Sequence, residues 1–220
     1  MNTKKYGPWI VALLLSVPLI YSVVIYPNLP SQIPTHFNIE GKPDAWGGPA
    51  SIFLGPGIMG AVSIFIYTLM TNLKSIDPKK YDASNDTLYT NFALITVAFL
   101  CMLSVLIIYA TTHDQINIGN NILPLIGIAF AGLGWYMPKF KQNYFVGFKL
   151  PWTLENEDNW NETHKVAGKV WLIGGLFQAI ASFTLSSKLG FICFITATAI
   201  MVIIPTIFSY RMFKNGNIIK

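Results

Sequence analysis

Long apolar runs without charged residues alternate with short polar segments along this chain. Six runs of this kind occupy residues 9–26, 52–70, 92–110, 122–137, 170–185 and 191–210. As α-helices, at about 1.5 Å per residue, they would span about 24 to 30 Å, close to the roughly 30 Å hydrocarbon core of a bilayer. The pattern predicts six transmembrane helices. The run at 122–137 is short, and we expect it either to thin the bilayer locally or to be a partly buried helix.

Small residues recur at helix-packing spacings in the fourth and fifth runs. They are Gly127, Ala131, Gly132 and Gly134 in one run and Gly174, Gly175 and Ala179 in the next. Helices in lipid associate through close backbone approach, which small side chains permit. We therefore expect the fourth and fifth helices to pack closely against each other.

Composition supports an all-α integral membrane protein. Hydrophobic residues make up 53% of the chain and charged residues 11%, with a mean hydropathy of +0.49, whereas a soluble domain has about 25% charged residues. The net charge of +5 therefore suits a lipid surface, and we expect no direct contact with nucleic acid. Cys101 and Cys193 each lie inside an apolar run and are expected to be reduced thiols.

Positive charge is distributed unevenly between the two sides of the predicted membrane. Of the 15 lysines and arginines, only Lys42 and Lys188 fall on the side opposite the N-terminus when six spans are counted. Cytoplasmic loops carry the excess of Lys and Arg, so both termini are predicted to be cytosolic. We expect one membrane unit with a first helix pair at 1–70, a middle pair at 88–137, and a polar loop with the last pair at 138–210.

The first predicted outer loop, residues 27–49, is rich in proline and glycine and reads PNLPSQIPTHFNIEGKPDAWGGP. Each proline fixes its own φ and restricts the residue before it, so the loop should be stiff. Residues 33–39 predict a short extended strand and residues 40–44 predict a turn. The result is a hairpin-like outer loop between the first two helices.

Candidate ligand-contacting residues of this loop are His36, Phe37, Gly41, Pro43, Asp44 and Trp46. Phe37 and Trp46 offer large apolar side chains on a preordered backbone. Two interpretations of His36 and Asp44 stay open: part of a ligand or metal site, or hydrogen bonding within a compact loop. A metal site needs three or four ligands, and we expect no metal and no cofactor.

The longest polar segment, residues 143–169, reads NYFVGFKLPWTLENEDNWNETHKVAGK. It contains two tryptophans, unlike a flexible Gly/Ser-rich tether. Gly147 permits a tight bend, and Pro151 favours an extended conformation at the residue before it. Thr153 or Asn156 is expected to cap a helix that continues through residues 160–164 into the next apolar run.

Several roles are open for residues of this segment. Trp152 and Trp160 suit either an aromatic belt at the membrane interface or a docking surface for a cytosolic protein. His164 near Glu162 permits an acid–base role, although a helix-surface pair is the simpler interpretation. The chain contains none of the common hydrolase or phosphate-binding motifs, so we expect no enzyme. The apolar runs contain no charged residue or histidine, which disfavours an ion-coupled transporter.

GFKLPWTLENEDNWNETHKVAGK resembles the signature of the SdpI-like family, membrane proteins that give bacteria immunity to a secreted peptide toxin. The residues that carry the likeness are Gly147, Pro151, Trp152, Thr153, Leu154, Glu157, Trp160 and Gly168. The outer-loop motif LPSQIPTHF…G.PD.W resembles a short domain of unknown function that often precedes the SdpI-like region. The family usually has Arg-Thr where this chain has Lys149 and Leu150, and lysine lacks the planar bidentate geometry of arginine.

The resemblance implies a multi-pass protein of the bacterial plasma membrane that binds a secreted antimicrobial peptide toxin. It also implies a second partner, a small winged-helix repressor captured on the cytosolic side. The docking candidates on that side are Gly147, Lys149, Pro151, Trp152, Thr153, Glu157, Trp160 and His164. The alternative that the sequence leaves open is a small permease or lipid-handling protein.

Overall fold

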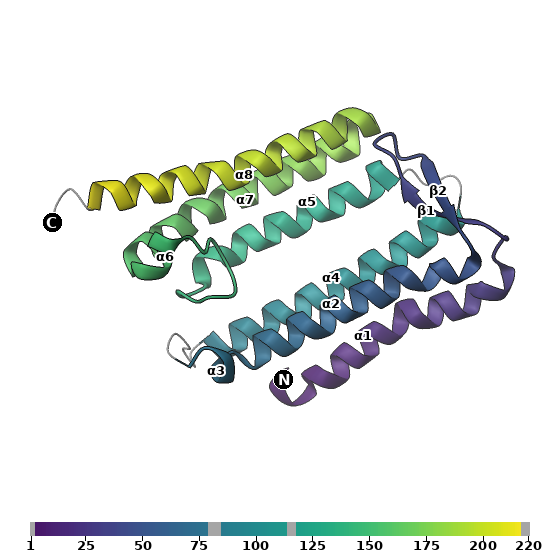
Figure 1. Cartoon of the computed structure of the whole chain (residues 1–220), viewed down its shortest axis with the longest axis horizontal. Helices are drawn as coiled ribbons and strands as arrows, with labels where there is room; N and C mark the ends of the chain where they lie inside the picture. Colours follow the sequence, from purple (N-terminus) through teal and green to yellow (C-terminus); the bar gives the residue numbers. More distant parts are fainter. Residues whose placement is uncertain (1–2, 79–84, 114–117, 217–220) are drawn as a thin grey trace. The chain divides into compact units, whose positions relative to one another are not determined.

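The computed structural model describes residues 3–78, 85–113 and 118–216 of this chain. It contains six helices that are long and apolar enough to cross a membrane, which confirms the predicted all-α membrane fold. They are α1 (Thr3–Ile25), α2 (Leu54–Thr71), α4 (Asp86–Thr112), α5 (Ile118–Tyr136), α7 (Glu157–Thr184) and α8 (Ser187–Gly216) (Figure 1). The shorter elements are η1 (Tyr26–Asn28), β1 (Ile33–Phe37), β2 (Pro43–Gly47), η2 (Pro49–Phe53), α3 (Leu73–Ile76), η4 (Met137–Lys139) and α6 (Pro151–Glu155).

All of the long helices except α2 are longer than the apolar run that predicted them. The fourth run was expected at 122–137, but α5 has 19 residues and begins at Ile118. A helix of that length rises about 28 Å, so it reaches across a hydrocarbon core of about 30 Å without local thinning. The polar residues that flank these apolar runs continue the helices into the headgroup region, where hydropathy alone gives no signal.

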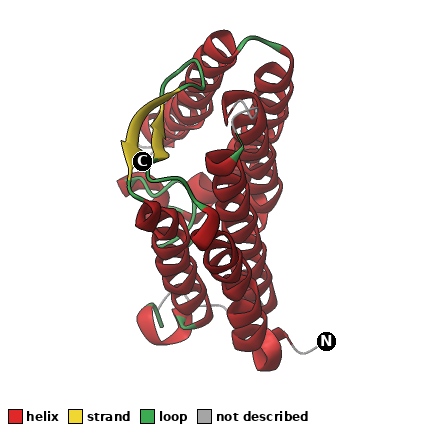
Figure 2. Ribbon diagram, turned by 90° about the vertical axis from the view of Figure 1, so that its right-hand side faces the viewer, coloured by secondary structure: helices red, strands yellow, loops and turns green. Residues whose placement is uncertain are grey.

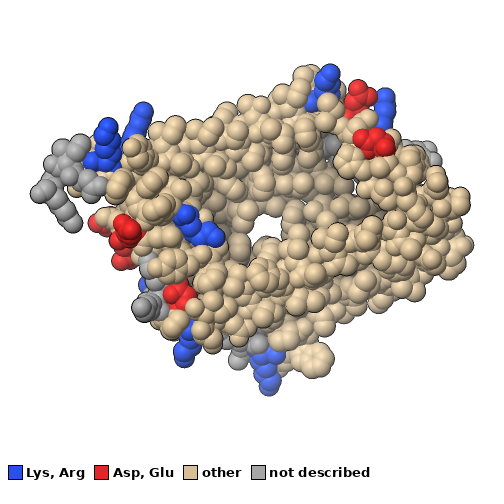
Figure 3. All heavy atoms as spheres, viewed as in Figure 1, with Lys and Arg blue, Asp and Glu red and all other residues tan. Residues whose placement is uncertain are grey.

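The surfaces of the six helices are apolar and exposed, as expected for side chains that face lipid. Trp9 and Leu13 of α1 are 76% and 68% exposed, and Phe183 of α7 is 71% exposed. In each part of the molecule the visible lysine, arginine, aspartate and glutamate side chains lie at helix ends and not along the spans (Figure 3). Only a bilayer satisfies such a surface, because its interior cannot hydrate charges but accommodates exposed apolar groups.

The helices form two compact units. The first unit contains α1, the β1–β2 hairpin, α2, α3 and α4, and the second contains most of α5 with α6, α7 and α8. The predicted middle pair, residues 88–137, is therefore divided, since α4 packs with α1 and α2. Lys79, Lys80 and Lys220, which contribute to the charge count for orientation, lie outside the described residues.

Two buried clusters hold the first unit together. Val11 of α1 packs with Val97 and Cys101 of α4 in one of them. In the other, Ile33 of β1 packs with Ile52 of η2 and Ile108 of α4, and Ile33 and Ile108 are only 2% and 1% exposed. The hairpin is thus anchored on the ends of the helices by one fully buried isoleucine.

The β1–β2 hairpin confirms the predicted hairpin between the first two helices, with its turn nearer the N-terminus than expected (Figure 2). The turn was expected at residues 40–44, but it lies at residues 38–42, and β2 already begins at Pro43. The side chain of Asn38 accepts hydrogen bonds from the backbone N–H groups of Glu40 and Lys42 at 2.9 and 3.1 Å. Gly41 adopts a φ of 76°, which is accessible to glycine. Asn38 and Gly41 therefore place the turn nearer the N-terminus than the sequence pattern predicted.

Glycines bring α5 and α7 into contact in the second unit, as predicted. A Cβ at Gly127 would lie 2.6 Å from the backbone nitrogen of Ala179, and one at Gly175 would lie 2.4 Å from that of Ala131. Two of the predicted small residues have other surroundings. A Cβ at Gly132 would meet no atom within 4 Å, and Gly174 faces Met201 of α8.

Cysteine labelling should reveal the orientation of the chain in the membrane. In a Cys101→Ser/Cys193→Ser background, Glu40→Cys in the hairpin turn should react with an impermeant thiol reagent in intact cells. Asp158→Cys at the start of α7 should react only after the cells are opened, because the lysine and arginine excess is predicted to be cytosolic. Both sites are exposed. Labelling of Asp158→Cys from outside would reverse the predicted orientation.

Substitution of Gly175 should destabilise the second unit. Even alanine there would overlap the backbone of α5, so Gly175→Ala should cost about 1–3 kcal/mol of folding stability. Gly132→Ala is the matched control, since it adds the same methyl group to a helix glycine with free space around it. Thermal unfolding in detergent would compare the two variants, and equal melting temperatures would contradict the close α5–α7 contact.

Candidate functional site

Side chains of α7 satisfy the backbone of the non-helical residues that precede it. The Trp160 indole Nε1–H donates to the carbonyl oxygen of Phe140 at 2.9 Å. His164 accepts from the Phe148 backbone N–H through Nε2 at 3.0 Å and donates from Nδ1 to the Trp160 carbonyl oxygen at 2.7 Å. These partners define the Nδ1–H tautomer, because Nε2 must carry a free lone pair.

Gly147 is required where this segment passes over α7. Its φ is 113°, and a Cβ at this position would collide with Nε2 of His164. The prediction that Gly147 makes a tight bend is therefore confirmed, and His164 supplies the reason for it. A side chain at this position would also displace the histidine from the Phe148 N–H.

Two residues organise the helix starts in the segment. Thr153 donates from Oγ1 to the Phe148 carbonyl oxygen at 2.6 Å and accepts from the Leu150 N–H at 2.9 Å. Asn156 accepts from the Asn159 N–H at 2.8 Å and caps α7. Of the two predicted capping residues, Asn156 therefore caps the long helix, whereas Thr153 lies in the first turn of α6 and satisfies the Leu150 N–H from there. Glu157 lies in the first turn of α7, where a negative charge is favourable.

A hydrogen-bonded network joins α6, α7 and α8. The hydroxyl of Ser209 donates to Oδ1 of Asn159 at 2.6 Å and accepts from the Trp152 indole N–H at 2.8 Å. Thr163 donates to the same Oδ1 at 3.0 Å, and the Asn159 amide donates to the Ser209 carbonyl oxygen at 3.0 Å. The Trp152 ring packs on Phe213 with centroids 5.6 Å apart. Sequence analysis missed Asn159, Thr163 and Ser209, although the spacing of Asn159 and Thr163 places them on one helix face.

Three of the residues predicted to form a docking surface are buried. Trp160 and Thr153 are 0% exposed and His164 is 1% exposed, so none of them can contact a soluble partner or form part of an interfacial aromatic belt. Trp160 and His164 instead stack on each other, with ring centroids 4.0 Å apart. The acid–base interpretation of His164 also fails, since Glu162 pairs with Lys165 at 2.6 Å. Lys149, Pro151 and Glu157 remain exposed, and Gly147 and Trp152 are half-buried.

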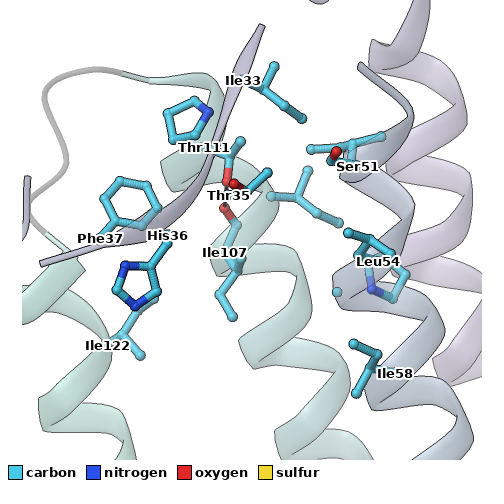
Figure 4. A pocket seen from close by; sticks show the side chains of 15 residues that line it. Ile33, Thr35, His36, Phe37, Ser51, Leu54, Ile58, Ile107, Thr111 and Ile122 are labelled. Atoms are coloured by element: carbon cyan, nitrogen blue, oxygen red, sulfur yellow. Dashed lines mark hydrogen bonds between the residues drawn. The ribbon is translucent and has the colours of Figure 1, made fainter. Parts of the chain in front are cut away.

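A pocket of about 510 Å³ lies beneath the hairpin in the first unit (Figure 4). Its wall is mainly aliphatic, with hydroxyl groups from two threonines and one serine. The lining residues are Ile33, Pro34, Thr35, His36, Phe37, Ser51, Ile52, Leu54, Gly55, Pro56, Ile58, Ile107, Ile108, Thr111 and Ile122. Pockets of about 300–1,000 Å³ with this kind of lining are typical of ligand sites.

Only some of the ligand-contacting residues predicted in the first loop line this pocket. His36 and Phe37 line it, whereas Gly41, Pro43, Asp44 and Trp46 do not. Asp44 nevertheless contacts the pocket indirectly, since its Oδ1 lies 2.6 Å from Nδ1 of His36. Trp46 is 55% exposed on β2. Within the described residues, no third His, Cys, Asp or Glu joins the pair to complete a metal-binding group.

Membrane-length helices with lipid-facing apolar surfaces, together with a structured polar segment that packs against two of them, define a multi-pass membrane protein. Residues 139–209 match the SdpI/YfhL protein family, and residues 13–60 match a domain of unknown function, DUF1648. The chain therefore contains the characteristic segment of the SdpI/YfhL family, preceded by the expected second domain, and the resemblance found in the sequence is confirmed.

A characterised relative agrees with this assignment. The chain is 27% identical over 203 residues to the immunity protein SdpI of Bacillus subtilis (strain 168), and the match covers 89% of this chain and 90% of that protein. No solved structure matches the chain significantly. Together with the six helices, the family places the chain in a bacterial membrane.

Truncation of Trp160 should show that the signature segment stabilises the fold. Trp160→Ala should cost about 3–5 kcal/mol, as expected for a buried large side chain. Trp160→Phe keeps a ring against His164 but leaves the Phe140 carbonyl oxygen without its donor, so about 1–3 kcal/mol is expected. Lys165→Ala, on the exposed face of the same helix, is the control. Melting temperatures in detergent that are equal for all three variants would contradict a structural role.

Proposed function

We propose that this chain is an immunity protein that protects its bacterial host from a secreted antimicrobial peptide. The pocket beneath the hairpin is the observation that carries the proposal, since it offers an apolar binding site at the predicted outer end of the first unit. The name of the characterised relative supports the same function. The role is one of binding, not of catalysis.

The placement of the pocket suits a ligand that arrives from outside and inserts into the outer leaflet. Ile58 lies on α2 just inside its start at Leu54, and Ile107 lies near the end of α4. A ligand in this pocket would therefore contact side chains at the depth of the membrane interface. Amphipathic peptides bind at this depth, with their apolar face about 5–10 Å into the boundary between headgroups and acyl chains.

A second role in signalling would use the exposed part of the signature segment. A soluble winged-helix repressor needs accessible side chains, and Lys149, Pro151 and Glu157 provide them, with Trp152 partly accessible. Capture of the repressor would follow if peptide binding altered this surface. The buried residues Trp160, His164 and Thr153 would affect docking only through the fold.

The alternative of a lipid-handling protein is favoured by one observation. An apolar groove of about 590 Å³ runs between α7 and α8 and is lined by residues such as Ile173, Phe177 and Ile200. Such a groove suits a lipid acyl chain. Flux of lipid or another substrate in proteoliposomes, without protection in cells, would favour this function over immunity.

Protection of a sensitive strain should depend on the pocket. Cells that express the chain should survive a cognate secreted peptide. Ile58→Trp places a larger side chain at the pocket and should lower the highest peptide concentration that the cells survive about tenfold or more. This corresponds to a loss of about 1.4 kcal/mol in binding. Phe37→Ala should act in the same direction because it removes an aromatic wall of the pocket.

The matched control is Ile64→Trp, which places the same side chain on an exposed part of α2 away from the pocket. Membrane levels of each variant should be compared by blotting. Full protection by Ile58→Trp at normal protein level would rule out the pocket as the peptide site. Absence of protection by the wild-type chain against every peptide from related bacteria would count against the immunity function itself.

A further inference from the structure

The His36–Asp44 pair has a geometry that presents one ring nitrogen for recognition. Nδ1 of His36 lies 2.6 Å from Oδ1 of Asp44, on the neighbouring strand of the hairpin. The carboxylate can only accept, so Nδ1 donates its hydrogen, and in the neutral tautomer that this geometry defines Nε2 carries the lone pair. No described residue forms a hydrogen bond with Nε2, and the histidine side chain is 70% exposed.

The pair contributes little to the stability of the hairpin. Exposed polar pairs contribute little to folding stability, and the His36 and Asp44 side chains are 70% and 41% exposed. The buried Ile33 and the side chain of Asn38 already anchor and close the hairpin. We therefore expect substitutions of His36 and Asp44 to leave the hairpin folded, so that a role of the pair in ligand binding can be tested separately from stability.

His36 brings this nitrogen to the edge of the apolar pocket. Figure 4 shows the His36 ring beside Phe37 and near Ile122, with the aliphatic residues Ile58 and Ile107 deeper in the pocket. A ligand with an apolar group in the pocket would therefore have a hydrogen-bond acceptor next to it. Neither lysine nor arginine lines the pocket.

The charge of the hairpin indicates which kind of hydrogen-bond donor a ligand would present to His36. Between Lys5 and Lys74 the only charged residues of the chain are Glu40, Lys42 and Asp44. Lys42 pairs with Glu40 at 3.2 Å, which leaves the Asp44 carboxylate as the uncompensated charge beside the pocket. An imidazole lone pair backed by a carboxylate suits a cationic donor better than an anionic group.

We propose that the occupant of this pocket is a cationic amphipathic peptide, with an apolar side chain in the pocket and an ammonium group on Nε2 of His36. Asp44 is the positioning residue, since it orients the imidazole and supplies the negative charge. This inference rests on the proposed function and narrows it, because it defines which secreted peptides the protein recognises. A peptide without an ammonium group near its apolar face would bind weakly.

Binding of two matched synthetic peptides to the full-length protein tests this inference. One probe is a fluorescent amphipathic helix of leucine and lysine, and its twin has every lysine replaced by glutamine. The protein is held in phosphatidylcholine nanodiscs, and binding to empty nanodiscs is subtracted. Wild-type protein should bind the lysine peptide about tenfold more tightly than the glutamine peptide, as one charge-assisted hydrogen bond provides.

Variants of the hairpin distinguish recognition by the His36–Asp44 pair from simple attraction to negative charge. In Asp44→Asn the lysine and glutamine peptides should bind with about equal affinity, while binding of the glutamine peptide stays the same. His36→Ala should also abolish the preference for the lysine peptide, and because His36 lines the pocket it is compared by the ratio of the two affinities. Glu40→Gln is the matched control, because it removes one negative charge from the same hairpin without touching His36 or the pocket. It should keep the preference. A structural role of Asp44 would instead weaken binding of both peptides equally.

Three results would overturn the inference: neither peptide binds wild-type protein, both bind equally, or Glu40→Gln loses the preference as fully as Asp44→Asn. Each can be separated from failure of the proposed function by the protection assay. Protection that is lost in Ile58→Trp but kept in Asp44→Asn would retain the pocket as the peptide site and reject the recognition pair. A confirmed preference without any protection in cells would reject immunity and retain the pair.

Discussion

Every backbone N–H and C=O group that is buried from water needs a hydrogen-bond partner, and this constraint shapes the second unit of the protein. Residues 140–150 are not helical, so their N–H and C=O groups have no partners in a helix of their own. Trp160, His164 and Thr153 supply partners from α6 and α7, with hydrogen bonds to Phe140 and Phe148. Trp160 and Thr153, two of the residues that carry the likeness to the family, thus fix an irregular chain segment against a helix together with His164.

This role changes the meaning of the signature for function. A segment with two tryptophans and a histidine on the predicted cytosolic side suggests a docking surface, but Trp160 and His164 are fully buried. The network around Asn159 and Ser209 extends the same packing to the end of α8. A partner on this side would recognise the surface that this core supports, and changes to the core would act on that surface through folding stability.

The first unit concentrates its accessible chemistry at the hairpin. Ile33 ties β1 to the helix ends, while the adjoining residues His36 and Phe37 line an apolar pocket. The stiff backbone keeps these side chains in place before a ligand arrives, which lowers the entropic cost of binding. Structural anchoring and ligand contact are thus assigned to neighbouring positions on a single strand of five residues.

The sequence by itself determined the number of spans, the hairpin and the close α5–α7 contact. Lipid imposes a minimum length on any apolar helix, and small residues at helical spacing are readable without coordinates. Even the bend at Gly147 followed from local backbone freedom. Only the tertiary structure decided which aromatic side chains are buried and which polar residues meet. Trp152 and Ser209 are 57 positions apart, and the pocket that His36 lines is completed by residues of α2 and α4. Such meetings depend on how helices pack, and hydropathy along a chain holds no information about partners distant in sequence.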